Sequence, residues 1–216
     1  MRQSPDPLII SGMSQANVPF EQPVRSYLDK IIKDRAVHAK FMNMLSMLEH
    51  MGSRKIMLSQ MHKGDSLNED TLKHLAEEAR HAYFFKRQAE RAAAHSLDGW
   101  NDDNTTARVP ALMYFGRMDA GISKIVGDEA AYGWVSLIIE LRACWLYNIY
   151  QDALDASDYQ LSLKSLIAEE DGHLAEMYEM CGSDTTRLRE LSAYETELFG
   201  KLWAKIDNPV QMKAAA

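Results

Sequence analysis

The sequence predicts an all-α domain, and three observations support this fold class. Only 6 prolines and 11 glycines interrupt the 216 residues, and they cluster in a few places. The long stretches between them repeat apolar residues at helical spacing. With 46% hydrophobic residues, the chain is large enough to bury a sizeable core as one domain, which we place at residues 24–206.

The elements follow from the positions of these breaks. Residues 1–23 hold four of the six prolines and predict an extended N-terminal arm. The expected helices then run over 24–33, 35–61, 66–96, 110–126, 128–156, 159–181 and 185–206, and a tail occupies 207–216. The last helix, which carries Leu191, Leu198, Leu202 and Trp203, either pads the core or joins two chains into a homodimer.

Two short turns predict two antiparallel hairpins. The turn "HKGDS" contains Gly64 as a helix stop, and Ser66 with Glu69 forms a capping box for the next helix. The turn "DASDYQ" is long enough only for a tight link between the helices at 128–156 and 159–181. Between the hairpins, "SLDGWNDDNTTARVP" and the helix at 110–126 are long enough to cross the length of a bundle.

Charge and composition exclude several classes of protein. A net charge of −7 and a pI near 5.5 argue against a general nucleic-acid binder, which needs a basic surface. No membrane span is expected, because no run of about 18 uncharged apolar residues occurs. The start "MRQSPDPLIISG" lacks the apolar segment of a signal peptide, which predicts a cytoplasmic protein. Cys144 and Cys181, without a CxxC, are expected to be buried thiols.

Two Glu-Glu-x-x-His clusters stand out, "LAEEARHAYF" at 75–84 and "LIAEEDGHLAEM" at 166–177. Helical phase places Glu78 and His81 on the apolar stripe of their helix, whereas Glu77 falls on the polar side. Glu170 and His173 lie on the apolar stripe of the other helix in the same way. Both clusters therefore direct a Glu-x-x-His pair into the core. Their neighbours Glu77 and Glu169 either hold the histidines in place or are surface charges.

A lone inward-facing acid precedes each cluster. Glu78 follows Glu49 by 29 residues and Glu170 follows Glu140 by 30, so the chain contains a twofold repeat of Glu…Glu-x-x-His. A chain that runs up one helix and down its partner, at about 1.5 Å per residue, returns to the same level. Each lone Glu is therefore expected to face its Glu-x-x-His across the hairpin.

Packing two such hairpins together would gather four carboxylates and two imidazoles, which is the ligand set of a dinuclear metal centre. The expected ligands are two bridging carboxylates, one imidazole for each metal and two terminal carboxylates: Glu78 and Glu170, His81 and His173, and Glu49 and Glu140. Hard oxygen donors with one nitrogen per metal favour two iron ions, with manganese possible and zinc as a substitute. Buried salt-bridge networks of the same residues are the alternative interpretation.

Several neighbours have two interpretations. Tyr147, two turns after Glu140, either supports a ligand or carries an electron, or is a hydrogen-bonded core tyrosine. His74 shares the stripe of Glu78, and a supporting or core role is favoured over metal ligation. His50 is expected to be polar or to pack rather than to bind metal. The six methionines between Met42 and Met61 are core filler or, alternatively, a flexible lining for an apolar substrate.

The six-ligand pattern resembles the ferritin-like di-iron carboxylate superfamily, which includes bacterioferritin, rubrerythrin, manganese catalase, ribonucleotide reductase small subunits and bacterial multicomponent monooxygenases. The resemblance covers about residues 35–181 and implies a ferritin-like four-helix bundle with additional terminal helices. Locally, "IIELRACWLYNIY" and Arg80 are similar to the cyanobacterial aldehyde-deformylating oxygenases, which makes Arg80 a candidate supporting residue. This sequence departs from that family at Leu48, Ile56 and Glu169, where the family has Gly, Tyr and Asp.

The resemblance implies a non-haem di-iron oxidoreductase that activates dioxygen or peroxide. The expected substrate is a small apolar molecule, admitted near Gly52 and Ser53. The chain has neither a flavin nor an iron–sulfur motif, so an external electron donor is expected. Two alternatives stay open: a peroxidase, catalase-like or ferroxidase protein without an organic substrate, and a structural helical bundle whose metal site is not catalytic.

Overall fold

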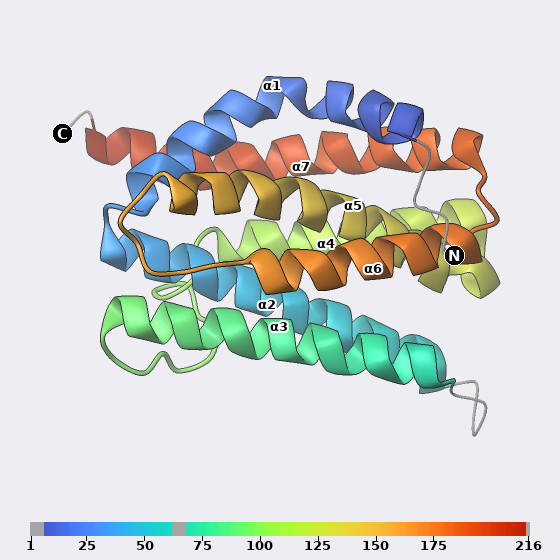
Figure 1. Cartoon of the computed structure of the whole chain (residues 1–216), viewed down its shortest axis with the longest axis horizontal. Helices are drawn as coiled ribbons and strands as arrows, with labels where there is room; N and C mark the ends of the chain where they lie inside the picture. The colour runs from blue at the N-terminus through green and yellow to red at the C-terminus, as the bar shows by residue number, and fades with distance from the viewer. Residues whose placement is uncertain (1–6, 62–67, 215–216) are drawn as a thin grey trace. The chain divides into compact units, whose positions relative to one another are not determined.

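The computed structural model describes residues 7–61 and 68–214, with side chains for 13, 15–61 and 68–208. All regular elements in these ranges are α-helices (Figure 1), which confirms the all-α prediction for this part of the chain. None of the helices in the described ranges is long and apolar enough to cross a membrane. The chain divides into two compact units, one of residues 31–115 and one of residues 1–30 and 116–216.

The unit of residues 31–115 is built on a helical hairpin. Its helices α2 (Arg35–Gln60) and α3 (Glu69–Ala93) lie side by side (Figure 1). Asp34 caps α2 by accepting hydrogen bonds from the backbone N–H groups of Ala36 and Val37. The predicted stop Gly64 and cap Ser66 lie outside the described residues. Asn68 is the N-cap of α3 and accepts from the Thr71 backbone N–H at 2.8 Å.

The loop that follows α3 is tied back to this hairpin by polar contacts. Asn43 of α2 is fully buried, and its Nδ2 donates to the backbone oxygen of Asn104 at 3.0 Å and to Thr105 Oγ1 at 3.1 Å. Lys86 of α3 donates to Asn43 Oδ1 at 3.1 Å and to the backbone oxygen of Gly99 at 2.8 Å. These contacts fix the start of the predicted crossover, whose helix α4 covers Arg108–Val126.

The other unit contains the second predicted hairpin, α5 (Asp128–Asp155) and α6 (Lys164–Met180). The α6 helix begins at residue 164, although the sequence predicts 159. Ser157 Oγ accepts from the Tyr159 backbone N–H, which gives the backbone a local alternative to the helix. The side chain of Gln151 then accepts from the Leu163 N–H at 2.5 Å and holds the linker against α5.

The N-terminal segment corrects the sequence prediction. Residues from Pro7 onward are not an extended arm, because α1 is helical over Pro7–Ile31. Proline fits the first position of a helix, where the missing N–H has no partner anyway. Pro19 and Pro23 lie inside the helix but are exposed, so water can reach the carbonyl groups that they leave unbonded. Val24 and Tyr27, which follow Pro23 closely, are almost fully buried and stabilise the helix.

The C-terminal helix α7 (Thr185–Ala214) is also longer than predicted and includes most of the expected tail. It packs against α1 within the same unit. Tyr27 meets Trp203 edge to face with ring centroids 5.3 Å apart, and Phe20 meets Phe199 in the same way at 5.4 Å. The apolar residues that define its predicted stripe are buried within the single chain, as padding of the core requires: Leu191, Leu198, Leu202 and Trp203.

Candidate metal centre

The unit of residues 31–115 brings three of the predicted ligands together. Glu49 on α2 and Glu78 and His81 on α3 are 8%, 4% and 3% exposed. Each offers one ligand atom that lies within 4.8 Å of the ligand atoms of the other two. His81 Nδ1 is 3.9 Å from Glu78 Oε1. This buried group, which we call the first half-site, could hold a metal ion.

Gly52 of α2 leaves the space that the Glu78 carboxylate occupies. A Cβ atom on Gly52 of α2 would stand 2.8 Å from Glu78 Oε2, which is closer than non-bonded atoms approach. Gly52 lies three residues after Glu49, so both residues are on the side of α2 that faces α3. A glycine inside a helix costs about 1 kcal/mol relative to alanine. At this position the glycine leaves room for the Glu78 carboxylate. The predicted role of Gly52 in admitting substrate stays a prediction.

His74 adds a second imidazole beside the first half-site. It is 2% exposed, and its Nε2 lies 3.6 Å from Glu78 Oε1. This separation permits a charge interaction but is long for a hydrogen bond. The two copies of the sequence repeat are 92 residues apart, so that Glu170 corresponds to Glu78. By the same offset, the residue that corresponds to His74 is Leu166. The two halves of the repeat therefore differ at this point, and His74 is available either as a ligand or as a group that positions Glu78.

The other unit gathers the remaining three predicted ligands, which we call the second half-site. Glu140 on α5 and Glu170 and His173 on α6 are 3%, 1% and 1% exposed. His173 Nδ1 lies 3.1 Å from Glu170 Oε2 and 3.8 Å from Glu140 Oε1. In both half-sites it is Nδ1 of the histidine that faces the glutamate three residues earlier. The same two residue types are thus paired in both half-sites, at hydrogen-bond distance in the second and at 3.9 Å in the first.

The predicted supporting residues occupy different environments. Tyr147 is 3% exposed and follows Glu140 by seven residues, which places both on one face of α5. The Arg80 side chain is 53% exposed and lies 3.8 Å from Glu77, so it belongs to the polar side of α3. Glu77 is also 3.7 Å from Lys73, but its side chain is only 12% exposed, so it is a half-buried acid paired with two basic residues and not a fully exposed surface charge.

Two further residue types behave as the sequence suggests. His50 stacks on the Trp100 ring with centroids 4.8 Å apart, and burial lowers its pKa. It therefore packs against the loop rather than joining Glu49. Cys144 is buried and Cys181 is half-buried, and burial raises the pKa of Cys181 to about 12. Both are free thiols.

No protein-family model, no curated protein and no solved structure matches this chain. The interpretation of the half-sites depends on their own chemistry and geometry. Two features of them are not evident from the ligand pattern alone, namely the proximity of His74 and the space provided by Gly52. A glycine in the interior of a predicted helix, one turn from a candidate ligand, is the sequence signal for the second of these.

Proposed function

We propose that the protein is a non-haem di-iron oxidoreductase in which the two half-sites act together as one dinuclear metal centre. The observation that carries the proposal is the repetition of one donor arrangement in two units. Each half-site buries a lone Glu with a Glu-x-x-His pair, and in each the histidine Nδ1 faces the glutamate. One such cluster is common by chance in a helical protein, whereas two with matched spacing are not.

The donor groups fit two divalent cations. Four carboxylates and two neutral imidazoles carry four negative charges, and two divalent ions neutralise them. Without such compensation, the burial of these carboxylates would cost several kcal/mol each. Carboxylate oxygens with one imidazole per half-site suit iron or manganese better than soft metals. Gly52 leaves space for the Glu78 carboxylate, as expected where a carboxylate must reach one defined position to bind a metal.

When bound, such a centre supplies Lewis acidity and two one-electron equivalents for the reduction of dioxygen or peroxide. The protein itself contributes a fixed set of ligands and a dry environment. Glu49, Glu78 and Glu140 come from long helices whose positions are set by core packing, and the surrounding side chains limit the access of water. In this proposal Tyr147, on the same face of α5 as Glu140, supports the second half-site. The electrons come from an external donor.

An apolar pocket in the unit of residues 31–115 supports a small apolar organic substrate. The pocket has a volume of about 300 Å³ and lies between α2 and α3. Its residues Ile56 and Gln60 follow Glu49 by seven and eleven positions, and Leu75 precedes Glu78 by three, so the pocket continues along the helix faces that carry the ligands. The flexible side chains of Met57 and Met61 line it and suit substrates of varied shape.

Metal content tests the proposal first. Protein expressed with ample iron is expected to contain two metal ions per chain by elemental analysis. Glu78→Ala and Glu170→Ala each reduce this number to one or none. Exposed acids of the same two helices offer matched controls, since Glu69→Ala in α3 and Glu179→Ala in α6 remove the same charge and should keep both metals. Wild-type protein with negligible metal would exclude the proposal and favour a structural bundle.

Reaction of the reduced, metal-loaded protein with dioxygen tests the oxidoreductase activity. We expect rapid oxidation with and without substrate, and conversion of a small apolar probe such as heptanal or hexane in the presence of a reductant. Consumption of peroxide or ferrous iron at a high rate, with no conversion of any apolar probe, would identify the alternative without an organic substrate.

A further inference from the structure

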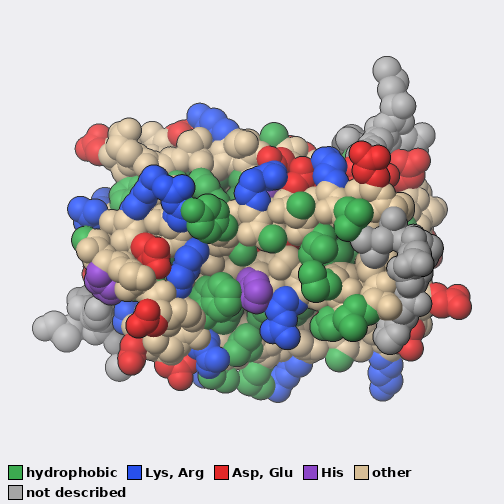
Figure 2. Space-filling view, turned by 90° about the horizontal axis from the view of Figure 1, so that it is seen from below, with side chains coloured by type: hydrophobic (Ala, Val, Ile, Leu, Met, Phe, Trp, Pro, Cys, Tyr) green, Lys and Arg blue, Asp and Glu red, His purple; other side chains and the backbone are tan. Residues whose placement is uncertain are grey.

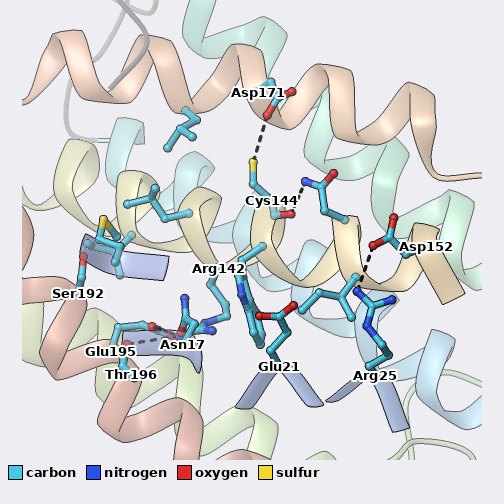
Figure 3. Close-up of a pocket in the computed structure, with 17 residues that line it drawn as sticks. Asn17, Glu21, Arg25, Arg142, Cys144, Asp152, Asp171, Ser192, Glu195 and Thr196 are labelled. Carbon is cyan, nitrogen blue, oxygen red and sulfur yellow. Dashed lines mark hydrogen bonds and ion pairs between the residues drawn. The ribbon is translucent and has the colours of Figure 1, made fainter. Parts of the chain in front are cut away.

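A second cavity lies in the unit of residues 1–30 and 116–216, and the proposed metal centre does not use it. Its volume is about 430 Å³, and α1, α5, α6 and α7 supply its walls (Figure 3). On α5 its wall includes Trp145, which follows Glu140 by five residues. At about 100° per residue, the two side chains leave the helix about 140° apart. Trp145 therefore points away from the second half-site, whereas Cys144, one turn after Glu140, and Asp171, next to Glu170, place one end of the cavity beside it.

The charges on the cavity wall do not balance. It carries four carboxylates and two guanidinium groups. Arg142 donates to both carboxylate oxygens of Glu195, from Nε at 2.8 Å and from Nη2 at 2.7 Å. Arg25 donates to Asp152 at 3.1 Å. Each guanidinium is thus matched by one carboxylate, which leaves two carboxylates in excess.

The two excess carboxylates are Glu21 and Asp171. Neither forms an ion pair among the residues that the structure describes. Asp171 accepts a weak hydrogen bond from the Cys144 thiol at 3.7 Å. The cavity therefore presents a net negative wall to any molecule that enters it.

Two buried oxygen atoms on the same wall have no hydrogen-bond partner among the residues that the structure describes. They are Asn17 Oδ1 on α1 and Ser192 Oγ on α7. Both residues line the cavity and are 8% and 6% exposed. Buried polar atoms in folded proteins are nearly always hydrogen-bonded. Figure 3 labels both residues among the side chains that line the cavity.

We propose that this cavity binds a small organic cation that consists of a primary ammonium group and an apolar body. An ammonium group has three donors and no acceptor. It therefore matches the two unpartnered oxygens, while Glu21 and Asp171 balance its charge. The apolar body packs against apolar residues of the wall such as Ile138, Leu141 and Leu174. A neutral or anionic molecule of the same shape would leave the excess carboxylates uncompensated.

Calorimetric titration of the full, metal-loaded protein tests this site. The probes are hexylamine, hexanol and hexanoate, which share one apolar body and differ in charge. We expect saturable binding of one hexylamine per chain, clearly weaker binding of hexanol and no binding of hexanoate. Glu21→Gln weakens hexylamine binding about five-fold, as for a partly exposed ion pair. Ser192→Ala should also weaken hexylamine binding, and it should leave the affinity for hexanol unchanged.

Glu129→Gln is the matched control, because Glu129 is an exposed acid of α5 that does not line the cavity. Glu21 is exposed as well, so its substitution leaves folding intact and carries the test by itself. Equal affinities for hexylamine and hexanol, or equal effects of the two Glu→Gln variants, would overturn the proposal. So would the absence of saturable binding for hexylamine, phenethylamine and butane diamine alike. Neither Glu21 nor Ser192 is an expected metal ligand, so the metal content of these two variants distinguishes a failure of this proposal from a failure of the metal-centre proposal.

Discussion

The Glu78 carboxylate occupies the space next to Gly52 where any other residue would place its side chain, 2.8 Å from the Cβ position. We expect Gly52→Ala to displace Glu78 and to weaken metal binding by about 10- to 100-fold, as other changes beside metal ligands do. Metal titration followed by elemental analysis measures the effect. Gly116→Ala in α4 is the control, since a Cβ there meets nothing within 4 Å. Equal metal affinity in both variants would contradict this role of Gly52.

Removal of the metal is expected to destabilise the protein. A ligand that binds only the folded state at 1,000 times its dissociation constant adds about 4 kcal/mol to the free energy of unfolding. Chelator should therefore lower the thermal midpoint of the wild type by many degrees. The Glu170→Ala variant should respond much less, because the second half-site has lost a ligand. Identical responses in the two proteins would indicate that the chelator does not act through this site.

The buried Arg142–Glu195 pair is expected to be far more important for stability than an exposed pair of the same length. Its side chains are 8% and 5% exposed at an N–O distance of 2.7 Å, whereas those of Arg187 and Glu190 are 36% and 53% exposed at 2.8 Å. Arg142→Ala leaves a buried carboxylate without its partner and should cost about 3–5 kcal/mol. Arg187→Ala should cost less than about 1 kcal/mol. Urea unfolding of both variants measures the difference.

The buried imidazole of His38 is expected to make the protein less stable in mild acid. Burial lowers its pKa from 6.5 to about 4 in the folded protein. Between these two values the unfolded chain binds more protons than the folded chain, so the free energy of unfolding falls as the pH falls. The largest loss from this residue is about 3 kcal/mol, reached near pH 4.

Comparison of two variants isolates this contribution from that of the other titrating groups. His38→Leu should flatten the decline in unfolding free energy between pH 7 and pH 4 relative to the wild type, whereas a substitution of His95, which is exposed, should leave it unchanged. If the two variants show the same pH dependence, the His38 imidazole is not the group responsible.

Local sequence determines which residues belong to the half-sites. Helical phase distinguishes Glu78 from Glu77, and the structure places Glu78 in the core and Glu77 between Lys73 and Arg80. The 29-residue interval from Glu49 to Glu78 is equally local, because one hairpin with a short turn fixes it. Glu49 and Glu78 therefore meet across the hairpin as predicted. Periodicity and turn length are sufficient for this part of the protein.

Other features were decided by contacts between distant segments. The prolines of α1 argue for an extended arm over residues 1–23, but Phe20 in this segment packs on Phe199 of α7, and such a contact outweighs the local preference. The space that Gly52 leaves for Glu78 depends on the distance between α2 and α3, which side-chain packing sets. Local propensities are worth a few tenths of a kcal/mol to 1 kcal/mol per residue, whereas burying a large side chain is worth about 1.5–3 kcal/mol. Tertiary packing therefore prevails wherever the two conflict.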